Sequence, residues 1–173
     1  MNINKQITKI FIFFFGLLIL NVSFPNSTQA AFVEVGNDAS ELTINGIGIG
    51  NYFDMNKLSS VFGDLLGPID QELDDDSQEI EFKLYFKNKI TVNFEKAKIH
   101  SLLIGSERSI NNVLLCTPRN IHVGSSLDEV WAAYGKKNAK DNFIFYDFPK
   151  CGGILFQLKN NRVIAIFINT NES

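Results

Sequence analysis

The feature that most constrains the fold is an approximate internal repeat with an offset of 72 residues. One apolar stripe at helical spacing consists of Leu127, Val130, Trp131 and Tyr134. A capping box at Ser126–Glu129 precedes this stripe, and Gly135 follows it. Seventy-two residues earlier, between Asp54 and Gly63, the same design is formed by Met55, Leu58 and Phe62, with Ser59 at the position of Trp131. The repeat predicts two related helices.

The same offset continues into alternating segments after each helix. Phe82, Leu84 and Phe86 match Ile154, Phe156 and Leu158, and a Lys/Asn turn follows both sets. On the returning strand, Val92 and Phe94 match Ile164 and Ile166. We therefore expect fold class α+β, with helices packed on an antiparallel sheet and repeats spanning 41–105 and 111–169. The alternative is a chance match between ordinary α+β patterns.

Further strands are predicted at Asn142–Phe148, Ala97–Ile104 and Asn111–Leu115. The first repeat carries Asp70–Asp76 where the second has its Asn142–Phe148 strand. The interpretation we favour for this acidic segment is a solvated loop that replaces a strand.

The first thirty residues are typical of a secretory signal peptide. Lys5 and Lys9 precede the apolar stretch Ile10–Leu20, Pro25 follows it, and Thr28–Ala30 supplies small residues at the cleavage site. Eleven residues would cover about 16 Å of a bilayer core of about 30 Å. We expect residues 1–30 to be removed, with a retained anchor as the alternative. The expected location is therefore secreted or periplasmic, with no membrane contact after cleavage.

Export changes the interpretation of the two cysteines, Cys116 and Cys151. An even number of cysteines in an exported chain favours a disulfide, whereas free thiols remain the alternative. The 19 acidic residues exceed the 16 basic ones, which argues against nucleic-acid binding by charge neutralisation.

A motif around the second helix resembles that of small secreted modules typified by beta-lactamase inhibitory protein, and of small outer-membrane-assembly lipoproteins. Its residues are Ile121, Val123, Gly124, Ser126, Glu129, Val130, Tyr134 and Gly135. The resemblance covers roughly residues 42–168. It implies helices on an antiparallel sheet and a non-enzymatic, protein-binding role. The chain departs from it at Asn51–Asp54, where the first copy of the motif is degenerate, and it has no lipobox cysteine.

Residues that could carry catalysis are sparse. His100 and His122 have no metal-ligand spacing, and Gly46–Gly50 has no phosphate-binding Lys. Five carboxylates in residues 70–76 leave a small-ligand or calcium site as an alternative function. We expect no catalytic residues, no bound metal and no cofactor, and we expect the chain not to be an enzyme.

The positive clue is an asymmetry between the two predicted hairpins. The face opposite the core is polar on the first hairpin, with Glu81, Lys83, Tyr85, Thr91, Asn93 and Glu95. On the second it carries Leu155, Gln157, Val163, Ala165 and Phe167. Such a face is covered either by the protein itself, through the other repeat, a terminal segment or a dimer mate, or by another protein. The second interpretation predicts an inhibitor- or adaptor-like protein of the cell envelope or medium, with binding residues Tyr146, Phe148, Leu155, Val163 and Phe167.

Overall fold

The computed structural model describes residues 39–67, 69–73, 80–87, 89–106, 109–110 and 112–170. The helical elements in this part of the chain are the 3₁₀ turn η1 (Ala39–Glu41), α2 (Met55–Phe62) and α3 (Leu127–Tyr134). The strands are β1 (Thr43–Ile44), β2 (Ile47–Gly48), β3 (Asp70–Leu73), β4 (Ile80–Phe86), β5 (Ile90–Glu95), β6 (Lys98–Ile104), β7 (Ser109–Ile110), β8 (Val113–Leu114), β9 (Phe143–Phe148), β10 (Gly152–Lys159) and β11 (Arg162–Asn169).

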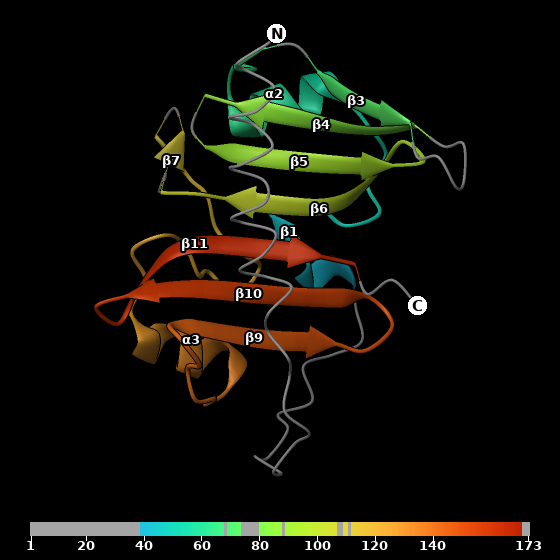
Figure 1. Ribbon diagram of the computed structural model, residues 1–173. Helices are drawn as coiled ribbons and strands as arrows, with labels where there is room; N and C mark the ends of the chain where they lie inside the picture. Colours follow the sequence, from blue (N-terminus) through green and yellow to red (C-terminus); the bar gives the residue numbers. More distant parts are fainter. Residues whose placement is uncertain are drawn as a thin grey trace, which may run out of the picture. The chain divides into compact units, whose positions relative to one another are not determined.

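Seven of these strands form one antiparallel sheet in the order β3-β4-β5-β6-β11-β10-β9. The strands β6 and β11 come from distant parts of the sequence and lie side by side in the middle of the sheet (Figure 1). The combination of helices with an antiparallel sheet confirms the predicted α+β class. The strands expected at 97–104, 111–115 and 142–148 also form, as β6, β8 and β9.

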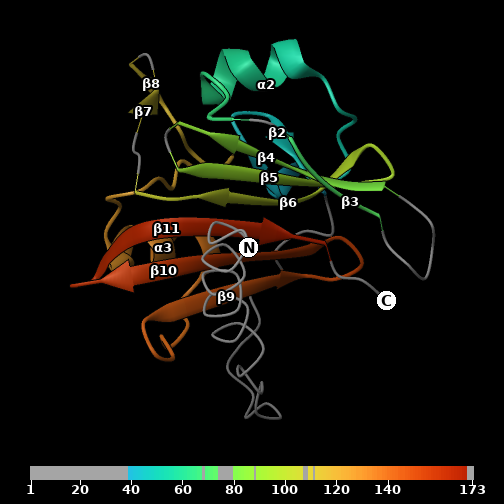
Figure 2. The ribbon, with the colours of Figure 1, turned by 45° about the horizontal axis from the view of Figure 1, so that its top comes forward.

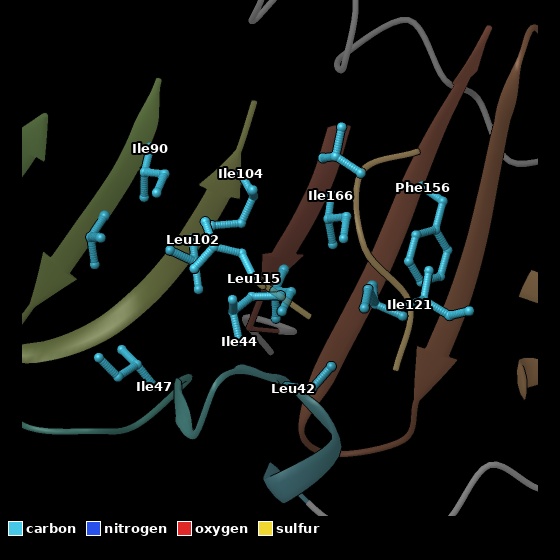
Figure 3. Close-up of a cluster of buried hydrophobic side chains, with 14 of the residues drawn as sticks. Leu42, Ile44, Ile47, Ile90, Leu102, Ile104, Leu115, Ile121, Phe156 and Ile166 are labelled. Carbon is cyan, nitrogen blue, oxygen red and sulfur yellow. The ribbon is translucent and has the colours of Figure 1, made fainter. Parts of the chain in front are cut away.

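A row of buried side chains crosses six of the seven strands, from β4 to β9. Its members are successive cross-strand partners and therefore point to the same face: Phe86, Ile90, Ile104, Ile166, Phe156 and Ile144. Each is at most 1% exposed. Leu42, Ile44, Ile47 and Leu115 lie against the middle of the row (Figure 3). This apolar row explains why all six strands join one core.

Both helices pack on this inner face. The ring of Phe62 in α2 contacts that of Phe86 at 5.7 Å between centroids, and Tyr134 in α3 contacts Phe156 at 5.3 Å. In the tilted view, α2 is seen on one side of the sheet, above β4 and β5 (Figure 2). The opposite side of the sheet is the outer face.

The predicted helix ends are confirmed. The Asp54 side chain accepts hydrogen bonds from the backbone N–H groups of Asn56 and Lys57, and Ser126 and Glu129 form a reciprocal capping box. Gly63 and Gly135 end the two helices with φ of 78° and 91°. These local signals lie entirely within the sequence pattern, so they could be recognised without the fold.

The offset of 72 residues holds for the helices and is wrong for the strands. Val92 and Phe94 belong to a hairpin with a three-residue turn, because Phe86 pairs with Ile90. Ile164 and Ile166 belong to a hairpin with a two-residue turn, because Lys159 pairs with Arg162. The two hairpins therefore differ in register, and β4–β5 is not the counterpart of β10–β11.

The hairpin that matches β10–β11 is β5–β6. Its two-residue turn, Lys96–Ala97, has φ of 52° and 59°, and Asn160–Asn161 has φ of 53° and 59°. A β-bulge follows each turn, and the extra residue that shifts the register is His100 in one hairpin and Ile164 in the other.

The segments that lead into the helices also match. Gly50 N–H donates to Ile99 O at 2.9 Å beside β6, as Gly124 N–H donates to Val163 O at 2.8 Å beside β11. The residue after each glycine accepts a second hydrogen bond: Asn51 O accepts from Ile99 N–H, and Ser125 O accepts from Val163 N–H, both at 2.8 Å. Asn51 is therefore the counterpart of Ser125. The β6–β11 pair thus joins a first unit, α2 with strands β3–β6, to a second unit, α3 with strands β9–β11.

The expected solvated loop at 70–76 is wrong in its first half, because residues 70–73 form β3. This strand pairs antiparallel with β4, and Asp70 lies opposite Lys83. Of the cross-strand pairs of β3, only Asp70–Lys83 joins opposite charges, because Glu72 lies opposite Glu81. Residues 74–76, like residues 1–30, lie outside the described part of the chain.

Candidate functional site

The outer face of the sheet is apolar over four strands. Phe145, Leu155, Phe167 and Leu103 are successive cross-strand partners on β9, β10, β11 and β6. In the next row, Phe143 and Ala165 lie on either side of Gln157. The apolar members of both rows define the outer patch: Leu103, Phe143, Phe145, Leu155, Ala165 and Phe167. All six are half-buried, whereas the inner row is fully buried.

The patch ends at β6, the strand of the first unit that borders the second. Leu103 pairs with Thr91 of β5, and Thr91 pairs with Tyr85 of β4. A polar row runs beside it through Asn169, Ser101, Asn93 and Lys83. Asn93 donates from Nδ2 to Ser101 Oγ at 2.6 Å, a hydrogen bond between two neighbours in this row. The contrast between a polar and an apolar hairpin, predicted from the sequence, is therefore a contrast between two parts of one continuous outer face.

The patch is fixed in position at its β9 end. A Cβ placed on Gly153 would lie 2.2 Å from Cε2 of Phe145, so the glycine leaves the space that this ring occupies. The Lys137 ammonium donates to the Phe145 carbonyl at 3.1 Å, and Lys140 and Phe143 exchange two backbone hydrogen bonds. Burial lowers the pKa of Lys137, and Asp147 opposes this effect. These contacts occupy much of the free edge of β9.

Of the five predicted binding residues, Leu155 and Phe167 lie in the patch and the other three do not. Tyr146 and Phe148 are 1% and 0% exposed on the inner face. Tyr146 contacts Tyr134 of α3 at 5.1 Å and donates from its hydroxyl to Gly135 O at 2.6 Å. Burial raises the pKa of Tyr146 to about 12. Tyr146 and Phe148 are core residues because the even-numbered positions of β9 face inward and the odd-numbered positions face outward.

Val163 is also a core residue, at 1% exposed. The bulge at Ile164 adds one residue between Val163 and Ala165, so the simple alternation that placed both on one face fails. Leu103, Phe143, Phe145 and Ala165 are the patch residues that the predicted binding set omits. Alternation within 98–104 and 142–148 was the signal for the first three, since it assigns every second residue to the outer face.

The expected disulfide is not present, since Cys116 and Cys151 are not joined in this structure. Cys116 Sγ lies 3.7 Å from Asn45 Oδ1, and burial raises the pKa of its thiol, which disfavours the reactive thiolate. Cys151 lies at the β9–β10 turn and packs against the core. The spacing of two cysteines in a sequence does not specify whether their Cβ atoms face each other.

The histidines contribute to the scaffold. His100 Nδ1 lies 3.1 Å from both Glu95 Oε2 and Thr170 Oγ1, beside a pocket of about 230 Å³. His122 Nδ1 lies 2.9 Å from Val123 O. Thr170 Oγ1 also lies 3.5 Å from His100 Nε2, so the hydroxyl lies beside both ring nitrogens. Within the described ranges, no group of three or more His, Cys, Asp or Glu side chains could hold a metal ion.

No protein-family model, no curated protein and no solved structure matches the chain. Among the helices formed by the described residues, none has the length and apolar character required to cross a bilayer.

Proposed function

We propose that the chain is an exported, non-enzymatic protein that works by binding another protein through the outer patch. The observation that carries this proposal is the contrast between the two halves of one sheet face. It is apolar over β9, β10, β11 and β6 and polar over β4 and β5. The leader-like sequence in residues 1–30 supports export, and the resemblance to secreted inhibitory modules supports a protein-binding role.

We further propose that the chain arose by duplication of a unit of one helix and three strands. The matching turns, bulges and lead-in hydrogen bonds of β5–β6 and β10–β11 support this origin. The β6–β11 pair also supports this origin. Leu103 and Phe167 are cross-strand partners, and they also occupy matching positions in the two units. Under this correspondence, β4, β5 and β6 match β9, β10 and β11, and β3 is an addition to the first unit.

The duplication makes the contrast between the halves informative. Counterparts on the outer face are Lys83 and Phe143, Tyr85 and Phe145, Thr91 and Leu155, and Ser101 and Ala165. The first unit keeps the same backbone arrangement with polar or amphipathic side chains at all four positions. Folding therefore does not require the apolar residues of the second unit, and contact with a partner is a reason for them to be there.

The test exchanges residues between the halves. The patch variant Phe143→Lys, Leu155→Thr and Ala165→Ser gives the second unit the side chains of the first at three of the four matched positions. Its control, Lys83→Ala and Thr91→Ala, alters the same positions of the polar half. Crosslinking in the native envelope or medium should link the wild type and the control to a partner protein, and the patch variant should lose that link.

Urea unfolding of all three proteins establishes that they fold. A patch variant that retains its stability and its crosslinked partner would contradict the proposal. A patch variant that unfolds would identify the face as part of the core. Leu155→Thr alone then serves as the milder variant, because threonine occupies the matching position on β5.

A further inference from the structure

We infer that the occupant of the outer patch is a single amphipathic helix of the partner protein. This inference rests on the proposed function and adds the shape of the partner. It follows from the size of the patch, from the state of the neighbouring sheet edge and from how the same strands are covered on their inner face.

The size of the patch argues against a second copy of the chain. Four strands spaced about 4.8 Å apart span about 14 Å, and two rows along the strands span about 7 Å. With the surrounding side chains, this is a few hundred Å², whereas a stable face-to-face dimer buries about 800 Å² on each partner. A dimer would therefore also cover Asn169 and Asn93, the half-buried asparagines of the polar row.

The state of the β9 edge argues against an extended peptide. Strand addition requires unpaired backbone groups. On β9, Phe143 N–H and C=O are paired with Lys140, and the Phe145 carbonyl accepts from Lys137. A partner at this end of the sheet must therefore bind through side chains on the face, which is the mode that an amphipathic helix uses.

The inner face of the same strands shows how much helix is needed. There α3 is eight residues long and buries Val130 and Tyr134, and Tyr134 contacts β9 and β10 through Tyr146 and Phe156. A helix that spans 14 Å needs about 10 residues at 1.5 Å each. Two to three turns with one apolar stripe thus match the outer patch, and the sheet would then be covered by helices on both faces.

The test uses two synthetic 14-residue peptides of identical composition, four leucines among lysines, glutamates and alanines. One spaces the leucines as i, i+3, i+4 and i+7, and the other alternates them. Titrated against the chain in the form that the producing cell releases, the helical peptide should bind at least tenfold more tightly than its isomer. Amide chemical shifts of Leu155 and Phe167 should move, and the patch variant should bind at least tenfold more weakly than the Lys83→Ala, Thr91→Ala control.

Equal binding of the two peptides, or unchanged binding by the patch variant, would overturn the inference. A wild-type dimer that the patch variant converts to a monomer would identify a second copy as the occupant instead. If the native crosslink depends on the patch and the helical peptide does not bind, the proposed function stands and only the shape of the partner is wrong. If neither depends on the patch, both are wrong.

Discussion

A few side chains join segments that are distant in the sequence. Asn45 has a φ of 49°, and its side chain donates to Leu114 O at 2.9 Å and accepts from Cys116 N at 3.0 Å. Asparagine tolerates this left-handed conformation and can make both bonds, so it ties the β1–β2 turn to the segment before the second unit. Arg119 similarly forms two hydrogen bonds to the Glu41 carboxylate and donates to Ala133 O at the end of α3.

The capping box gives a prediction about acid stability. Hydrogen bonds from the backbone and side chain of Ser126 lower the pKa of Glu129. Because the folded-state pKa lies below the unfolded one, the stabilising contribution is present above the unfolded value, near 4.5, and is lost as the pH falls through the folded one. Between pH 6 and 3, Glu129→Gln should therefore lose less stability in urea melts than the wild type does. An identical pH dependence would contradict this prediction.

At the scale of elements, the two matched hairpins differ in how well their turns suit the backbone. Both turns hold two residues at positive φ, which favours Asn and Gly. The second turn is Asn160–Asn161, whereas the first is Lys96–Ala97.

Ala97→Gly should therefore stabilise the protein by about 1 kcal/mol, since alanine is strained in the left-handed region. The measurement is the midpoint of urea unfolding. Asn161→Ala is the matched change in the other hairpin and should destabilise by a similar amount. A destabilising Ala97→Gly would show that the cost of glycine flexibility in the unfolded chain exceeds the strain that is relieved.

Sequence reasoning recovered the elements better than their connections. Helices 55–62 and 127–134 are specified by caps and stripes within ten residues, and so were predicted with their ends. The pairing of β6 with β11 involves residues more than 60 positions apart, and no local pattern encodes it. The bulge at Ile164 changes which side Val163 faces by one residue, and alternation alone does not reveal such an insertion. The bulge accounts for Val163 alone, whereas Tyr146 and Phe148 lie on the inner face of β9, a strand that is apolar on both faces at 143–146.

At the scale of the molecule, one core joins both units, and the chain should unfold as a whole. Phe62 lies in the first unit and is 0% exposed, and the single tryptophan, Trp131, lies in the second. Phe62→Ala should cost about 3–5 kcal/mol. Because the inner row is continuous, Trp131 fluorescence and circular dichroism should both report this loss at the same urea midpoint.

Leu66→Ala is the control, since Leu66 is 64% exposed and its truncation should leave the midpoint nearly unchanged. A Trp131 transition that stays at the wild-type midpoint in Phe62→Ala would show instead that the two units unfold independently.

The position of β11 has a consequence for biogenesis. The last strand of the described chain lies in the centre of the sheet, against β6. While a ribosome is still making residues 162–169, the nascent polypeptide lacks the strand that pairs with β6. The buried row then lacks Ile166, the residue between Ile104 and Phe156. The native sheet can thus close only after residues 162–169 have been made, and until then β6 and β10 each lack the strand that separates them.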